Sequence, residues 1–286
     1  MECIANGGLI SGVASFVILL SLGSPTAAQD PKPKNTVLEN LALCNGIDRT
    51  SYELQINGCT AIIDLGEHTP AAAIAYNNRG NAYAEKGDYD RAIQDFDQSI
   101  KLNPTNPKPF NNSGVAYVKK GEYDIAIKSH DEAIRLNPNY VKAFVNRAET
   151  YLKKNEYDRA ARDYDEAIRL EPNSRTARNG RCWTRAILGQ LQAALEDCNK
   201  SLQLGPTDAA TYDSRGLTYM KLGQLDTAID DYNSALQLEP TLASALYGRG
   251  LAKLKKGDKV GSDADISAAK KIQARIGDEF TNYGAK

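Results

Sequence analysis

The chain has few residues that could perform chemistry. Its 286 residues include only two histidines, His68 and His130, and contain no GxSxG, HExxH, phosphate-loop or dinucleotide-binding motif. Neither histidine lies near a cysteine in the sequence, and no CxxC occurs, so the spacing typical of a zinc site is missing too. We therefore predict that the protein is not an enzyme and that it carries no cofactor and no metal.

The chain also lacks an excess of charge of either sign. Lys and Arg number 35 against 36 Asp and Glu, and the densest basic clusters are pairs such as Lys119–Lys120. Nucleic acids and anionic membranes are bound mainly through dense positive charge. The charge balance therefore argues against a nucleic-acid partner and against attraction to an anionic membrane.

No apolar run is long enough to span a bilayer comfortably. The longest, Leu9–Leu22, has about 14 residues, and a Gly-Ser-Pro break and the small residues Thr26-Ala27-Ala28 follow it. This pattern is typical of a signal peptide, although the segment before it carries Glu2 and no Lys or Arg. We predict a signal peptide over residues 1–28, a periplasmic or secreted protein, and no membrane insertion after the signal is removed. A retained anchor is the alternative.

What the chain does contain is a repeat of 34 residues that begins at Ala73. Six units follow one another without an insertion. One column holds mainly glycine, another mainly tyrosine, a third alanine, and a proline closes each of the first five units. These columns are Gly80, Gly114, Ala148, Cys182, Gly216 and Gly250; Tyr83, Tyr117, Tyr151, Arg185, Tyr219 and Lys253; Ala92, Ala126, Ala160, Ala194, Ala228 and Ser262; and Pro104, Pro138, Pro172, Pro206 and Pro240.

Each unit has the pattern of two helices. Apolar residues recur at spacings of three and four, as at Ala92, Phe96 and Ile100. A residue of the Gly87 type ends the first helix, because it accepts a left-handed backbone, and a proline of the Pro104 type ends the second. One such hairpin cannot bury its apolar face alone. The units are therefore expected to stack into a right-handed superhelix with a concave side.

These columns resemble the tetratricopeptide repeat (TPR), a helix–turn–helix family of 34-residue units. The segment NNRGNAYAEKGDYDRAIQDFDQSIKLNP matches the family pattern almost throughout, with Arg79 in its leucine column. The resemblance implies an all-α, right-handed superhelical solenoid over residues 73–276. The sixth unit is degenerate, with Lys253, Lys259 and Ser262 at apolar or small positions. We expect it to be a cap whose outer face meets water, followed by a C-terminal tail over residues 277–286.

Outside the repeats, the chain resembles a group of exported TPR proteins of Gram-negative bacteria. The likeness lies in the predicted signal peptide, the CTAIID stretch, the RCWTRAILGQ stretch and the ending GDEFTNYG. It implies the location and architecture of the protein more than an activity. Residues 29–72 are expected to form a linker and a degenerate N-terminal capping hairpin, since Cys59 falls in the column of Phe96. Thr69 and Pro70 then suit the N-cap and the first position of the next helix.

Four cysteines remain after removal of the signal, which takes Cys3 with it. Cys182 stands in the small column of a first helix and Cys198 in the aromatic column of a second. In the hairpin that the TPR resemblance implies, these columns face each other at a distance that suits a disulfide. Cys44 and Cys59 have almost the same spacing, so we predict the disulfides Cys44–Cys59 and Cys182–Cys198 in an oxidising compartment. Four buried free thiols are the alternative.

The first helices of a TPR stack line its groove, and their exposed positions are the candidate binding residues. Asparagines recur there in the first three units and resemble a TPR groove that holds peptide backbone, a role that suits amides because each offers donors and an acceptor. In the later units, apolar residues replace the asparagines, and we expect them to anchor a peptide or a partner helix. For Trp183, the alternative is that it packs on a neighbouring unit. The candidates are Asn77, Asn78, Asn81, Asn111, Asn112, Asn146, Trp183, Leu217, Met220 and Leu251.

The sequence thus predicts a protein- or peptide-binding scaffold that uses the concave groove of its solenoid and has no catalytic activity. The partner is expected to be a protein or peptide of unknown identity. The alternative function is a structural component of an envelope assembly that acts through its convex face or its ends. An enzyme is a distant third, because no segment is left that could form a catalytic domain.

Overall fold

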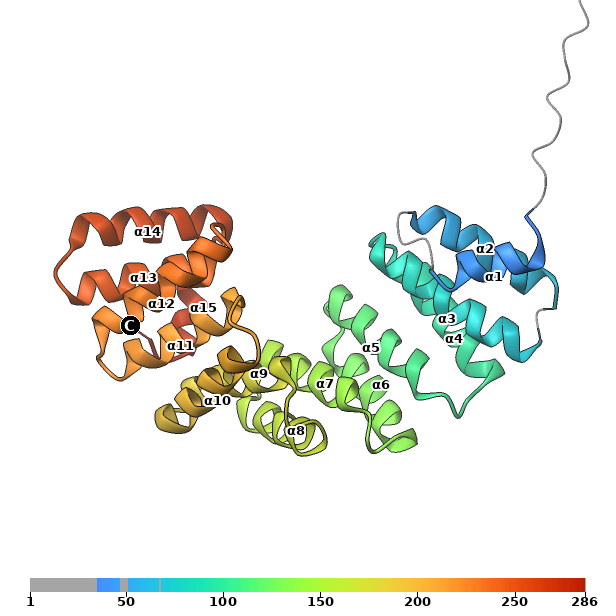
Figure 1. Cartoon of the computed structure of the whole chain (residues 1–286), viewed down its shortest axis with the longest axis horizontal. Helices are drawn as coiled ribbons and strands as arrows, with labels where there is room; N and C mark the ends of the chain where they lie inside the picture. Colours follow the sequence, from blue (N-terminus) through green and yellow to red (C-terminus); the bar gives the residue numbers. More distant parts are fainter. Residues whose placement is uncertain (1–34, 47–50, 67, 286) are drawn as a thin grey trace, which may run out of the picture. The chain divides into compact units, whose positions relative to one another are not determined.

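The structure is a computed structural model that describes residues 35–46, 51–66 and 68–285, and in these residues all regular structure is helical (Figure 1). The predicted signal peptide lies outside the described residues. No helix within them is long and apolar enough to cross a membrane. The helices are α1 Val37–Cys44, α2 Tyr52–Asp64, α3 Pro70–Glu85, α4 Tyr89–Leu102, α5 Pro107–Lys120, α6 Tyr123–Leu136, α7 Val141–Lys153, α8 Tyr157–Leu170, α9 Arg175–Ile187, α10 Leu191–Leu204, α11 Ala209–Lys221, α12 Leu225–Leu238, α13 Ala243–Lys255, α14 Lys259–Ile272 and α15 Ile276–Asn282.

The helix ends lie where the repeat pattern predicts them. A residue with positive φ lies one or two positions after the end of each first helix: it is glycine in five units, for example Gly87 at 80°, and Asn155 at 59° in the third. Asparagine is the residue that best replaces glycine in this conformation. Ahead of α3, the Thr69 hydroxyl accepts a hydrogen bond from the Ala72 amide and Pro70 begins the helix, which confirms both predicted roles.

Each odd-numbered helix from α3 to α13 packs against the even-numbered helix that follows it, and those from α3 to α11 also pack against the first helix of the next hairpin. The small column allows this close packing. A Cβ added to Gly80 would lie 2.7 Å from the Phe96 ring, and one on Gly114 would lie 2.5 Å from His130. His130 is fully buried in the aromatic column, and burial lowers its pKa to about 4. We call the side formed by α3, α5, α7, α9, α11 and α13 the first-helix face.

An ion-pair column that the sequence reasoning missed joins the two helices of five hairpins. In the third hairpin, Arg147 donates two hydrogen bonds to Asp163, at 2.8 and 2.7 Å, and a third to Asp131 of the preceding hairpin. Planar guanidinium groups suit such bidentate contacts. The second hairpin has Ser113 and Ser129 at the equivalent positions. The equivalent pairs are Arg79–Asp95, Arg181–Asp197, Arg215–Asp231 and Arg249–Asp265.

The sixth hairpin differs from the predicted cap. Its second helix ends at Ile272, four residues before the expected end of the repeat domain, and of the polar replacements Ser262 is fully buried whereas Lys259 is exposed. Lys253 is neutralised by Asp265, with 2.8 Å between Nζ and Oδ2. Beyond this hairpin, the segment predicted as a tail forms α15, which packs against α13.

Candidate functional site

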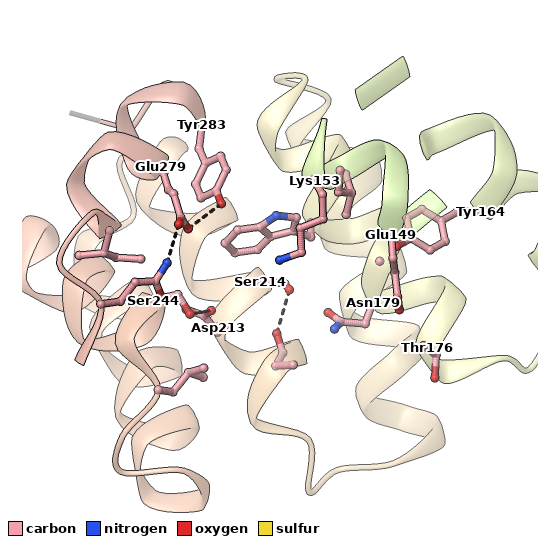
Figure 2. Close-up of a pocket in the computed structure, with 17 residues that line it drawn as sticks. Glu149, Lys153, Tyr164, Thr176, Asn179, Asp213, Ser214, Ser244, Glu279 and Tyr283 are labelled. Carbon is pink, nitrogen blue, oxygen red and sulfur yellow. Dashed lines mark hydrogen bonds between the residues drawn. The ribbon is translucent and has the colours of Figure 1, made fainter. Parts of the chain in front are cut away.

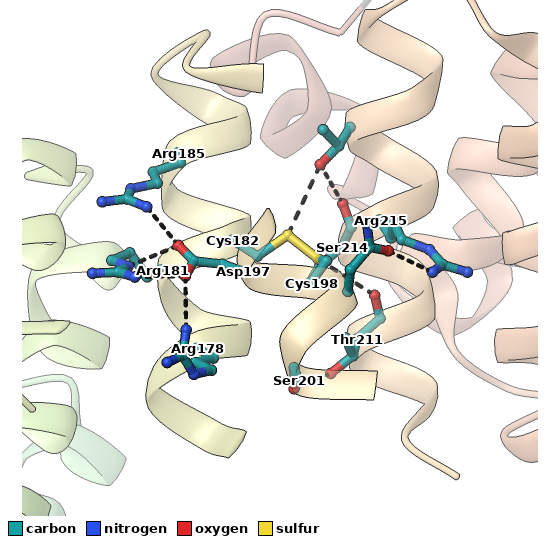
Figure 3. The surroundings of a disulfide bond; sticks show 12 residues. Arg178, Arg181, Cys182, Arg185, Asp197, Cys198, Ser201, Thr211, Ser214 and Arg215 are labelled. Atoms are coloured by element: carbon teal, nitrogen blue, oxygen red, sulfur yellow. Dashed lines mark hydrogen bonds and ion pairs between the residues drawn. A yellow bond between two sulfur atoms is a disulfide. The ribbon is translucent and has the colours of Figure 1, made fainter. Parts of the chain in front are cut away.

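Two cysteine pairs lie at disulfide-bonding distance, and both are the predicted pairs. Cys182 of α9 and Cys198 of α10 have Cα atoms 5.4 Å apart, and the bond joins the two helices of the fourth hairpin (Figure 3). Cys44 and Cys59 join α1 to α2, with Cα atoms 4.5 Å apart. The side chains are 2 % exposed or less. Both links are therefore buried between packed helices, a setting that suits a structural link and disfavours thiol exchange with another protein.

The predicted asparagines of the first-helix face hydrogen-bond to one another. Asn146 of α7 donates to Asn111 of α5 at 2.9 Å, and Asn112 of α5 donates to Asn77 of α3 at 3.0 Å. Within each helix the neighbouring asparagines are also joined, and Asn78 donates to Asn45 at 3.2 Å. The result is a head-to-tail amide chain, which runs in the order Asn146, Asn111, Asn112, Asn77, Asn78, Asn45.

The amide chain leaves part of its hydrogen-bonding capacity unused. Asn77 and Asn111 are buried, whereas Asn78, Asn112 and Asn146 remain half-buried on the first-helix face, as does Asn81. A side-chain amide has two N–H donors and two acceptor lone pairs, and each asparagine of the chain uses only part of them. The chain holds the three half-buried amides in place and leaves them capacity to bind a peptide backbone.

The chain of asparagines stops after the third hairpin for a steric reason. The position equivalent to Asn112 and Asn146 is Gly180 in the fourth unit, and a Cβ there would lie 2.3 Å from the Tyr164 ring. The same relation links Gly248 to Tyr232, at 2.4 Å. Where the aromatic column holds a tyrosine, its phenol group occupies the space that an asparagine fills elsewhere.

The predicted apolar anchors are buried. Leu217, Met220 and Leu251 are 0, 4 and 8 % exposed, so the expectation that they are exposed is wrong. They share one hydrophobic cluster with Ile276 and Phe280 of α15, two residues four apart on one helix face. The burial of apolar surface holds α15 against the first-helix face.

Trp183 contacts the same segment. Its ring and that of Tyr283 form an edge-to-face pair with centroids 5.2 Å apart, and the Tyr283 carbonyl accepts a hydrogen bond of 2.8 Å from Lys221 of α11. The packing partner of Trp183 is thus the C-terminal segment, 100 residues away in the sequence. The indole remains half-buried and lines a hollow beside α15.

This hollow, which we call the Asp213 pocket, has a volume of about 440 Å³. Residues of α7, α9, α11 and α13 and of the segment 273–283 line it. In Figure 2, Asp213 and Glu279 lie on one side of the pocket and Glu149 and Asn179 on the other. A second hollow of about 510 Å³ shares Trp183 and Tyr283 with it and extends to Asn155 and Asn282.

The most deeply buried carboxyl group that lines the pocket is that of Asp213, which is 5 % exposed. Ser244 donates a hydrogen bond of 2.5 Å to its Oδ2, whereas Oδ1 has no donor among the described residues. Burial raises the pKa of this carboxyl to about 7, against the opposing effect of the Ser244 hydrogen bond. The Asn179 side-chain oxygen is also buried and has no donor in the described part of the chain. Two residues that line the pocket thus each have a buried acceptor without a donor in the described part of the chain.

Asp213, Asn179 and Ser244 were absent from the sequence-based candidates, although the repeat contains a signal for the first two. The fifth column of the units holds Asn77 and Asn111, both candidates, and continues as Asn179 and Asp213 in the fourth and fifth units. The third and sixth units have Val145 and Tyr247 in this column, so Asp213 is its single acid. The covering of the apolar positions carried no such signal, because it depends on a contact between distant segments.

The comparisons with known proteins agree with this architecture. Models of the tetratricopeptide repeat match residues 73–106, 114–155, 145–209 and 216–257. No curated protein sequence matches the chain significantly.

Solved structures share the fold at low sequence identity. A tetratricopeptide repeat protein from Parabacteroides merdae is 18 % identical with a TM-score of 0.67, over 87 % of this chain and 100 % of that one. The TPR protein YrrB is 22 % identical with a TM-score of 0.53, over 67 % and 97 %. PilF of Pseudomonas aeruginosa is 16 % identical with a TM-score of 0.60, over 73 % and 96 %. By its repeats and its fold, the chain belongs to the tetratricopeptide repeat family.

Proposed function

We propose that the protein is a non-catalytic scaffold that binds a protein or peptide partner on its first-helix face. The observation that carries this proposal is the hollow beside Trp183, where a half-buried indole, unused polar acceptors and the ordered amides of α5 and α7 occur on the same face. Aromatic anchors with a few oriented polar groups are typical of peptide-binding surfaces. The structure of YrrB is described as having an unusual peptide-binding site, which supports peptide binding as a use of this fold.

We further propose that the protein acts in the periplasm or outside the cell. The two cysteine pairs at bonding distance suit an oxidising compartment, where such links form and persist. The apolar segment Leu9–Leu22 supports export, by the sequence pattern alone.

Site-specific photocrosslinking in the native envelope tests the proposal. A photoreactive benzoylphenylalanine is placed at Asn112 on the first-helix face or, as the matched control, at the exposed Glu196 of α10 in the other layer. We expect protein adducts at Asn112 that mass spectrometry identifies, that weaken when Trp183→Ala is added, and that are absent at Glu196. Adducts only at Glu196 would contradict the proposal and favour the alternative, an assembly component that acts through its other face.

A further inference from the structure

We propose that the Asp213 pocket binds a guanidinium group, the side chain of an arginine in the partner. This inference rests on the proposed function, because it names the chemistry that one part of the first-helix face recognises. It predicts that the partner presents an arginine where its chain passes between α9, α11 and α15.

The first support is the buried carboxylate. Asp213 is almost completely removed from solvent, and one of its oxygens has no donor among the described residues. A buried carboxylate oxygen without a partner is costly, and the cost disappears when a cationic donor reaches it. Because Asp213 lines the pocket, a ligand that enters the pocket can supply that donor.

The second support is the composition of the pocket wall. Three carboxylates line the pocket, Glu149, Asp213 and Glu279, against a single amine, that of Lys153. The unused Asn179 oxygen adds a neutral acceptor on the opposite side (Figure 2). Such a wall attracts a cation and repels an anion.

The third support separates a guanidinium from an ammonium. Trp183 and Tyr283 border the pocket, and a guanidinium is planar, so it can stack on an aromatic ring while its five N–H groups reach separate acceptors. An ammonium is a compact, strongly hydrated charge that matches such a wide set of acceptors less well.

Protonation of Asp213 should compete with the cation. The groups that face this carboxyl are Ser244 of α13, Glu239 before α13, the Tyr232 hydroxyl of α12 and Tyr283 of the C-terminal segment. None of them is a cation that would favour the ionised form. The pKa of the carboxyl is therefore about 7, and the group is mostly protonated below that pH. A cationic ligand binds the ionised form, and its affinity should therefore rise with pH through this range.

The test uses the full mature chain and two small probes, acetylarginine methylamide and the uncharged acetylcitrulline methylamide of nearly the same shape. Trp183 is the only tryptophan and lines the pocket, so its fluorescence and its indole N–H resonance report binding. At pH 8 we expect the arginine probe to bind at least about tenfold more tightly than the citrulline probe. The lysine analogue should bind less tightly than the arginine probe. Equal affinity of lysine and arginine would contradict the guanidinium assignment.

The variant Asp213→Asn should abolish the preference for arginine over citrulline, whereas Asp230→Asn, at an exposed acid of α12, should leave it unchanged. The unmutated protein provides a second measurement that needs no variant. Its affinity for the arginine probe should be about tenfold weaker at pH 6 than at pH 8, because most Asp213 is protonated at pH 6.

Equal affinities for the arginine and citrulline probes, or a preference that survives Asp213→Asn, would overturn the inference. Photocrosslinks at Asn112 would then still support the proposed function, so the two failures can be told apart. Absence of those crosslinks, with adducts only on the opposite layer, would overturn the proposed function and this inference together.

Discussion

The two halves of the first-helix face satisfy their side chains in different ways. On α3, α5 and α7 the face is polar, and its amides bond across the gap between successive hairpins. On α9, α11 and α13 its large apolar side chains are buried in, or packed against, one hydrophobic cluster that includes Ile276 and Phe280 from the end of the chain. A short polar side chain can find its partner in the neighbouring repeat, whereas an apolar surface needs a separate element to exclude water.

This contrast explains where a pocket forms. The amide chain of the first half is continuous, and its members are held by one another. In the second half, Oδ1 of Asp213 and the side-chain oxygen of Asn179 have no donor in the described residues, whereas Oδ2 of Asp213 accepts a hydrogen bond from Ser244. Residues of α15 and of the first-helix face line this pocket together, with Asp213 and Glu279 on one side and Glu149 and Asn179 on the other (Figure 2).

The largest expected effect comes from removal of the covering contact. Phe280 is 1 % exposed and packs on Tyr247 with ring centroids 4.9 Å apart. Phe280→Ala should lower the free energy of unfolding by about 3–5 kcal/mol, the range for a buried phenylalanine. Chemical denaturation measures the loss, and amide hydrogen exchange should locate it in α13 and α14, the helices that α15 contacts. Val260→Ala, at an exposed side chain of α14, should cost almost nothing. Equal effects would mean that α15 is not part of the folded core.

The next effect concerns the link inside the fourth hairpin. Replacement of Cys182 and Cys198 by serine should lower the free energy of unfolding by about 3 kcal/mol, because the unfolded chain loses a closed loop. Denaturant titration of the double variant against the oxidised protein measures this. Thiol titration of the unfolded, non-reduced mature protein is the independent check, and four reactive thiols would contradict both disulfides.

Asp213 should make the second half sensitive to pH. Burial raises the pKa of the Asp213 carboxyl from 3.8 to about 7. Between these two pH values, the native state therefore keeps a proton that the unfolded state has released. This group's stabilising contribution is therefore complete below about pH 4 and is lost as the pH rises through 7. Asp213→Asn should raise the free energy of unfolding at pH 8 by about 2 kcal/mol and have little effect at pH 4. Melting curves at the two pH values measure the difference. A variant that is less stable at pH 8 would contradict the assignment.

The smallest effect tests the first half. Asn112 makes two bonds of the amide chain and Asn146 makes one. Asn112→Ala should cost about 1 kcal/mol, and Asn146→Ala about half as much, because fewer partners are left unsatisfied. Urea denaturation of both variants gives the comparison. If Asn146→Ala cost more than Asn112→Ala, the bonds of the chain would not determine the stability of this half.

The sequence by itself determined the repeat, its helices and its cysteine pairs. Local rules suffice there, since a glycine or asparagine ends each first helix, the small column sets the helix spacing, and the facing columns bring Cys182 near Cys198. Sequence also placed the asparagines on the first-helix face, without showing that they bond to one another.

Only the tertiary structure decided what the second half of that face presents. The burial of Leu217 and Met220 and the edge-to-face contact of Trp183 with Tyr283 join residues 60 to 100 positions apart, outside the 34-residue period. The burial of Asp213, and with it the raised pKa, follows from the same packing. A repeat pattern specifies neighbours at one fixed spacing. The C-terminal segment lies outside the repeats, so the repeat spacing does not specify its contacts. The place where α15 packs depends on which apolar surface remains uncovered after the hairpins have stacked.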